Sequence, residues 1–153
     1  MGCISAIDHE TRVDVQELLS RYCHYLDRNR GDCWAQLFTR DGVYENSDGI
    51  VLRGRAELAS LPSIVGRDGA GMLRHIVSSI IVDRLDTSRD LLVSAYGLVA
   101  DLRGEGGFTK FYDYKVRINR TPAWRIASLM ATRVGGIGPA LPGSRIAERA
   151  LHS

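Results

Sequence analysis

The residues best suited to proton transfer in this sequence are one histidine and one carboxylate, His75 and Asp27. His75 stands near the start of a segment rich in β-branched residues, and strand alternation places it on one face with Val77, Ser79 and Ile81. A single histidine on an apolar face is more often an ordinary core residue than a catalyst. Beside a carboxylate it gains basicity and a fixed tautomer. Asp27 is the natural candidate for that partner.

Asp27 closes a segment with the periodicity of an amphipathic helix. At about 100° per residue the apolar residues before it form one stripe, which consists of Val15, Leu18, Leu19, Tyr22 and Leu26. Asp27 lies on the flank of this stripe, and a carboxylate near a helix C-terminus is disfavoured by the helix dipole. Two interpretations stay open: a polar turn over residues 27–31, or a side chain that enters a cavity and orients His75.

The chain divides into a helical first part and a strand-rich second part. Helices are expected at 11–30, 33–38 and 54–65, with Pro62 bending or ending the last one. The first helix is expected to be capped by Thr11 and to end by Gly31. A short hairpin is expected from strands 43–45 and 50–53. Four long strands follow, and their short connections predict an antiparallel meander of segments 72–85, 91–102, 108–119 and 124–134.

This order predicts an α+β fold in which a strongly curved, mostly antiparallel sheet and three helices enclose a cone-shaped pocket. The domain is expected to span residues 11–134, after an N-terminal arm at 1–10. Residues 135–153 are expected to form a C-terminal tail with a short helix at 144–151, suited to docking on a neighbouring subunit.

The bulk composition argues against several partners. The chain has 153 residues and a net charge of +2, from 20 basic and 18 acidic residues that are scattered along the sequence. This pattern gives no footprint for nucleic acid and no polybasic patch for a membrane surface. No apolar run is long enough to span a membrane, and no signal peptide is visible. Three cysteines without a paired spacing favour reduced thiols in a cytoplasmic protein.

No cofactor or metal is expected from the sequence. The histidines and aspartates form no compact ligand set for a closed zinc site. Cys23 and Cys33 have no basic cluster nearby that would activate a thiol nucleophile. Neither a phosphate-binding loop nor a dinucleotide fingerprint is present.

A succession of short motifs resembles the SnoaL-like branch of the NTF2-like superfamily, especially members similar to scytalone dehydratase, bile acid dehydratase and hexachlorocyclohexane dehydrochlorinase. The matching segments run in order from about residue 10 to 134, and are residues 21–27, 34–44, 74–79, 111–113 and 124–127. Each motif alone is weak, but their succession is fairly specific for the fold. It is much less specific for a reaction, because this fold hosts many unrelated ones.

The resemblance implies roles for individual residues. In the dehydratase-like members an aspartate that ends the first helix pairs with a histidine on the long strand, and these match Asp27 and His75. A tyrosine five residues before that aspartate matches Tyr22 as the third catalytic residue. The second catalytic histidine of scytalone dehydratase has no equivalent here. The candidate substrate-binding residues are Tyr44, Trp34, Phe111 and Arg133.

The alternatives for these aromatic residues are structural. Trp34 is more often a packing residue than a ligand contact in such a position, and Tyr22 and Tyr44 would be read as core-edge residues without their spacing to the pair. Phe111 stands where relatives often carry a tyrosine, so a hydroxyl is lost from the pocket or its rim. Alternation alone does not show which face of the strand at 108–119 lines the pocket.

The function expected from this resemblance is a cofactor-independent lyase or isomerase of the dehydratase type. Its substrate would be a hydrophobic, carbonyl-bearing ring compound such as a steroid, terpenoid or polyketide, and His75, held by Asp27, would carry out the general acid–base chemistry. Two alternatives share the fold: a non-catalytic small-ligand binding protein, and a structural subunit like the small subunit of ring-hydroxylating dioxygenases. The long exposed sheet and the tail predict a homo-oligomer, either a dimer or a trimer.

Overall fold

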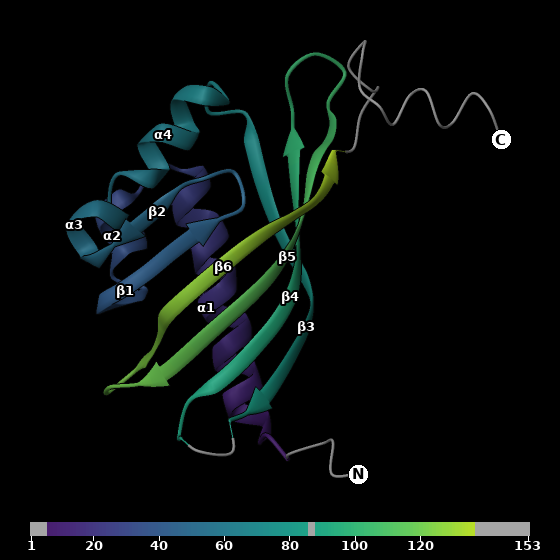
Figure 1. The fold of residues 1–153 in the computed structure, drawn as a ribbon. Coiled ribbons are helices and arrows are strands. Elements are labelled where there is room, and N and C mark those ends of the chain that lie inside the picture. Colours follow the sequence, from purple (N-terminus) through teal and green to yellow (C-terminus); the bar gives the residue numbers. More distant parts are fainter. Residues whose placement is uncertain (1–5, 86–87, 137–153) are drawn as a thin grey trace, which may run out of the picture.

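Helices cover one side of a single bent sheet in the computed structural model, which describes residues 6–85 and 88–136 (Figure 1). The helices in this part of the chain are α1 (His9–Asp27), α2 (Gly31–Ala35), α3 (Gly54–Leu58) and α4 (Leu61–Asp68). The strands are β1 (Phe38–Asn46), β2 (Val51–Arg53), β3 (Leu73–Arg84), β4 (Leu91–Asp101), β5 (Gly107–Arg120) and β6 (Trp124–Gly136). The predicted α+β cone fold is confirmed. The predicted tail helix at 144–151 lies outside the described residues.

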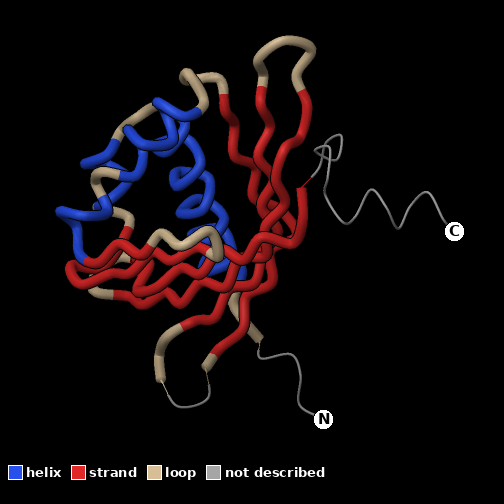
Figure 2. Tube along the Cα trace, turned by 45° about the horizontal axis from the view of Figure 1, so that its top comes forward, coloured by secondary structure: helices blue, strands red, loops and turns tan. Residues whose placement is uncertain are grey.

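The six strands follow the order β2-β1-β6-β5-β4-β3. Strands β3 to β6 form the predicted antiparallel meander, and β1 and β2 form the predicted hairpin. β1 joins the meander by pairing in parallel with β6. Figure 2 shows that the sheet bends strongly and that the helices lie within the bend. This arrangement brings α1 and α4 over the same face of the long strands.

The predicted face of β3 is wrong beyond Val77. A bulge shifts the register between Ser78 and Ile81, and Ser79 adopts a positive φ of 53°. An extra residue in one strand sends the following side chains to the opposite faces. As a result Val82 is buried and Ile81 is 58% exposed. His75 and Val77 precede the bulge and keep the inward direction that alternation predicted.

The ends of α1 differ in detail from the prediction. Asp8 caps the helix, because its Oδ1 accepts a 2.8 Å hydrogen bond from the backbone N–H of Thr11. At the other end Asn29, not Gly31, supplies the left-handed conformation, with φ 54°. Gly31 instead allows a close approach, since a Cβ there would collide with the carbonyl oxygen of Ala59.

The third predicted helix is interrupted. The sequence predicts one helix over residues 54–65, but the structure has α3 and α4 separated by Ala59 and Ser60. Pro62 lies in the first turn of α4, where its missing N–H costs no hydrogen bond. The break lets α4 turn over the open end of the sheet (Figure 1).

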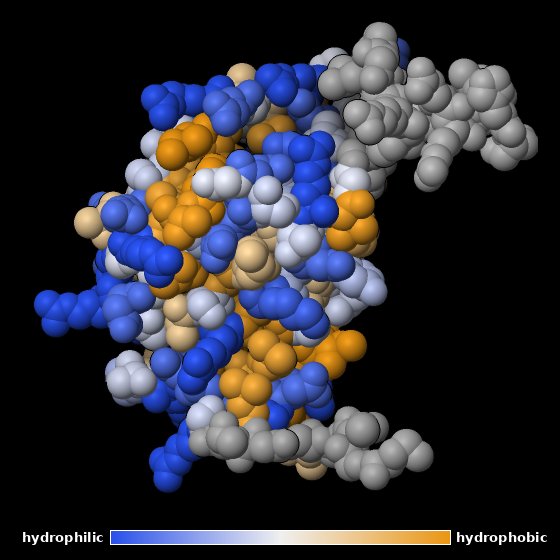
Figure 3. Space-filling view, in the orientation of Figure 1, coloured by the Kyte–Doolittle hydropathy of each residue, from blue (hydrophilic) through white to orange (hydrophobic). Residues whose placement is uncertain are grey.

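The outer face of the sheet mixes charged and apolar side chains. Figure 3, in the orientation of Figure 1, shows hydrophilic residues in blue next to hydrophobic residues in orange. Ile81, Tyr96 and Met130 are exposed. The predicted homo-oligomer stays a prediction.

No helix within the described residues is long and apolar enough to cross a membrane.

Candidate active site

Asp27 and His75 meet at the junction of α1 and β3. The Nδ1 atom of His75 lies 2.6 Å from Oδ1 of Asp27, and the backbone N–H of His75 donates to both carboxylate oxygens at 3.0 and 3.2 Å. The two side chains are only 10% and 7% exposed. A carboxylate only accepts hydrogen bonds, so Nδ1 carries a proton, and in the neutral ring Nε2 is the nitrogen without one.

The structure explains why Asp27 turns inward although it lies on the flank of the apolar stripe. The stripe itself is buried as predicted. α1 ends at Asp27, and the chain then reverses through Asn29. The last turn of α1 therefore places the carboxylate against the backbone of β3. Its hydrogen bonds to His75 offset the unfavourable position of a negative charge at a helix C-terminus.

His75 lines a cavity of about 300 Å³ between the helices and the sheet. Its apolar wall comes from the helices α1 and α4, from the long strands and from the residue before β2, and includes Leu26, Ile50, Leu61, Ile64, Leu73 and Val99. The polar groups near its rim include Asn46, Asp48, Lys110 and Arg133. The lining thus combines apolar side chains with polar and charged groups, which suits a small organic ligand that carries polar substituents.

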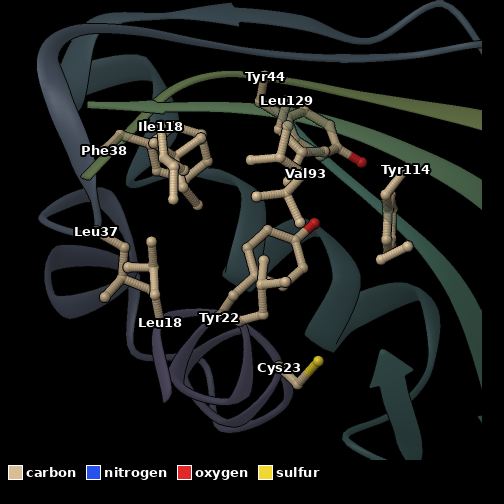
Figure 4. Packing of buried hydrophobic residues seen from close by; sticks show 14 of the residues in the cluster. Leu18, Tyr22, Cys23, Leu37, Phe38, Tyr44, Val93, Tyr114, Ile118 and Leu129 are labelled. Carbon is tan, nitrogen blue, oxygen red and sulfur yellow. The ribbon is translucent and has the colours of Figure 1, made fainter. Parts of the chain in front are cut away.

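Four tyrosines project into this cavity: Tyr22 from α1, Tyr44 from β1, and Tyr112 and Tyr114 from β5. Figure 4 shows the hydroxyls of Tyr22 and Tyr44 directed toward the side where Tyr114 lies. Burial raises the pKa of Tyr22, Tyr44 and Tyr114 above the ordinary phenol value. Burial also raises the pKa of Tyr112, helped by its hydrogen bond to Asp48. The four phenols are therefore neutral hydrogen-bonding groups at neutral pH.

These raised pKa values predict a loss of stability in alkali. The unfolded chain releases phenol protons above about pH 10, whereas the folded chain retains them. Below that pH the buried tyrosines contribute their full stabilisation. Above it, each buried tyrosine should lower the free energy of unfolding by about 1.4 kcal/mol per pH unit. Urea unfolding between about pH 9 and pH 11 measures the slope of the unfolding free energy against pH. Tyr114→Phe should reduce this slope by the contribution of one tyrosine. An identical slope in this variant would contradict the assignment.

Gly97 makes room for Tyr114. It lies on β4 opposite Tyr112, and a Cβ at this position would come within 2.6 Å of Cζ of the Tyr114 ring. Real Cβ atoms do not approach a ring so closely, so any larger residue would displace Tyr114. Glycine at position 97 therefore helps to set the position of a cavity tyrosine.

The structure brings some of the predicted site residues together and leaves others apart. Tyr22, Tyr44 and Arg133 line the cavity with His75. Trp34 is fully buried behind the cavity, where its ring packs 5.4 Å from Tyr22 and 5.8 Å from Tyr44. It supports the two tyrosines from the core side.

Phe111 lies on the outer face of the sheet, because the inward positions of β5 are taken by Tyr112 and Tyr114. Its ring packs 5.5 Å from the ring of Tyr96. The structure does not bring Phe111 to the cavity.

Residues missed by the sequence reasoning include Tyr112, Tyr114 and Asp48. Strand alternation places both tyrosines on one face of β5, but the direction of that face was open.

A second hollow, of about 570 Å³, lies between α1 and β3 and also reaches His75. Cys23 and His24 line it. Burial, and next the nearby Asp27 carboxylate, raise the pKa of the Cys23 thiol to about 12. This thiol is therefore protonated at neutral pH, and the hollow offers no activated nucleophile.

Among the described residues no group of three or more His, Cys, Asp or Glu side chains is placed to hold a metal ion.

Comparison with known families identifies the chain. A model described as a SnoaL-like domain matches residues 8–130. The chain belongs to the SnoaL-like family. Comparison with curated protein sequences gives no match.

Solved structures share the fold of this SnoaL-like chain. An NTF2-like protein with a cystatin-like fold from Novosphingobium aromaticivorans is 23% identical, with a TM-score of 0.73, over 94% of this chain and 90% of that one. Aln2 from a Streptomyces species is 19% identical, with a TM-score of 0.76, over 84% and 94%. ActVI-ORFA from Streptomyces coelicolor is 16% identical, with a TM-score of 0.73, over 86% and 100%. At these identities the likeness establishes the fold alone.

Proposed function

We propose that this SnoaL-like protein is a cofactor-independent lyase or isomerase of the dehydratase type. Its substrate is a hydrophobic, carbonyl-bearing ring compound of a size that the 300 Å³ cavity admits. The observation that carries the proposal is the buried contact of Asp27 with His75 at the wall of a cavity lined by four tyrosines. A histidine oriented by a carboxylate is suited to general-base chemistry.

The proposed reaction begins at Nε2 of His75. This atom removes a proton from the carbon next to the substrate carbonyl, and the C–H electron pair forms the enolate. Asp27 stabilises the imidazolium that results. The phenols of Tyr22 and Tyr44 donate hydrogen bonds to the enolate oxygen, which suits the raised pKa of both groups because it keeps their protons available.

The second half of the reaction releases the leaving group. The enolate electrons re-form the carbonyl and expel a hydroxide from the β carbon, while His75 returns its proton to that oxygen, so that water leaves and a conjugated enone remains. A substrate without a leaving group would be reprotonated at another carbon, which is isomerisation. Both outcomes regenerate neutral His75 and need no oxidant or reductant.

The test is an elimination assay with a panel of monocyclic and bicyclic β-hydroxyketones. The appearance of the conjugated enone is followed by its ultraviolet absorbance. We expect the wild-type protein to accelerate elimination for at least one member above the rate in buffer. Tight binding of panel members with no acceleration would refute the enzymatic proposal and favour a ligand-binding protein.

A further inference from the structure

The hydroxyl of Tyr112 faces the cavity as a hydrogen-bond acceptor and not as a donor. Its hydroxyl donates a 3.1 Å hydrogen bond to Oδ2 of Asp48. A phenol has one proton, and a carboxylate can only accept it. The proton of Tyr112 is therefore committed to Asp48, and the lone pairs of its oxygen are the groups left to interact with a ligand. The Tyr112 side chain is buried, with a relative exposure of 8%.

The hydroxyl of Tyr44 has the opposite hydrogen-bonding role, that of a donor to the cavity, because of Asn46. Oδ1 of Asn46 accepts backbone N–H bonds from Asp48 and Ile50, at 3.1 and 3.0 Å. These two bonds fix the orientation of the amide, so Nδ2 is the atom that faces the Tyr44 hydroxyl at 3.5 Å. Tyr44 accepts from Asn46, and its own proton remains free to donate into the cavity.

The loop that carries Asp48 is held in place by several contacts. Asn46 closes its turn through the two backbone bonds. Ser47 accepts a 2.7 Å hydrogen bond from the backbone N–H of Arg133, and the Arg133 guanidinium lies 3.7 Å from Oδ1 of Asp48. Arg133 and Tyr112 are opposite each other on neighbouring strands. The carboxylate of Asp48 thus lies between the Arg133 guanidinium and the Tyr112 hydroxyl.

We infer that Tyr112 is a specificity residue that accepts a hydrogen bond from a hydroxyl of the substrate. The substrate class is then a ring compound that carries a free hydroxyl besides the carbonyl that reacts. Asp48 is a positioning residue, because it acts by keeping the Tyr112 proton out of the cavity. This inference rests on the proposed function, which supplies the carbonyl-bearing ring compound.

The physical basis is the cost of an unpaired acceptor. A ligand hydroxyl that points at Tyr112 gains a hydrogen bond in a buried place. A methoxy group at the same position sets two acceptors against each other and leaves both without a donor. The cavity should therefore distinguish a hydroxyl from its methyl ether more strongly than their similar size suggests.

The test measures equilibrium binding of matched probes. The 4-, 5- and 6-hydroxy isomers of 1-indanone are each compared with the corresponding methoxy-1-indanone by isothermal titration calorimetry. For the best isomer we expect the wild-type protein to bind the hydroxy compound about five- to tenfold more tightly than its methyl ether. No binding of any hydroxyindanone, or equal affinity within each pair, would overturn the inference.

Variants separate specificity from a general effect on the cavity. In Tyr112→Phe and in Asp48→Ala the affinity ratio between the two compounds should fall to about one, because the fixed acceptor is lost. Tyr96→Phe removes a hydroxyl from the outer face and should keep the ratio. A ratio that persists in Tyr112→Phe would overturn the inference.

The same binding measurement distinguishes this inference from the proposed function. His75→Gln should keep the affinity ratio, since binding at Tyr112 needs no proton transfer at His75. A wild-type ratio of about one with normal elimination would overturn the selectivity alone. A normal ratio without elimination would refute the reaction and leave the selectivity standing.

Discussion

Replacing His75 with glutamine is expected to lower the turnover number for elimination by about 10²–10⁴, the usual contribution of a positioned general acid–base group. The amide has no group that can take a proton from carbon. The fold should survive, because the backbone N–H of His75, and not its ring, makes two of the three hydrogen bonds to Asp27. Steady-state kinetics on the substrate found in the elimination assay give the number.

The matched control is His24→Gln. His24 is exposed on α1 and lies outside the interior cavity. We expect it to keep the wild-type turnover number, while thermal unfolding reports whether either variant has lost stability. Turnover within about threefold of wild type in His75→Gln would refute the role of this residue as the base.

The second large effect is expected for Asp27→Asn. The amide oxygen can still accept from the backbone N–H of His75, but the amide nitrogen would then donate to Nδ1 of the ring. This forces the imidazole proton onto Nε2, the atom that must accept the substrate proton, and removes the charge that stabilises the imidazolium. We expect a loss of about 10²–10⁴ in turnover number.

The tautomer provides a readout that a purely structural role would not change. Nitrogen-15 chemical shifts of the His75 ring should show the proton on Nδ1 in the wild-type protein and on Nε2 in Asp27→Asn. Asp14→Asn changes an exposed carboxylate on the same helix and serves as the control. An unchanged tautomer together with unchanged turnover in Asp27→Asn would show that Asp27 does not orient His75.

The order of elements could be predicted because it depends on local patterns, whereas the contact of Asp27 with His75, 48 residues later in the chain, was expected from the resemblance to the SnoaL-like family. The apolar stripe of α1 fixes which face of the helix is buried, and short connections between long strands leave few alternatives to a meander. The direction of Asp27 was open, because it depends on the turn after the helix. Asn29 makes that turn, and the backbone N–H of His75 then captures the carboxylate.

Side-chain direction in the strands was harder to predict. The bulge at Ser79 has no sequence signature, yet it reverses the faces of Ile81 and Val82. In β5 the sequence showed that Phe111 and Tyr112 point opposite ways but not which one points inward. That depends on the helices that cover the sheet, which is a tertiary property.

Asp48 and Asn46 were missed because their role depends on contacts distant in sequence. Both belong to what reads as an ordinary polar turn between two short strands. Their effect on the site appears only when β5 brings the Tyr112 hydroxyl to the Asp48 carboxylate. Within its own turn Asn46 has a local signature, since an asparagine commonly accepts a backbone N–H two residues ahead.

Proton abstraction from carbon by His75 is the central claim, and hydrogen–deuterium exchange measures it without requiring a leaving group. The probe is 1-indanone in deuterated buffer, with loss of the proton signal from the carbon next to the carbonyl followed by nuclear magnetic resonance. We predict that the wild-type protein accelerates this exchange above the buffer rate and that His75→Gln does not. Equal exchange rates for the wild-type protein, His75→Gln and buffer would contradict the claim.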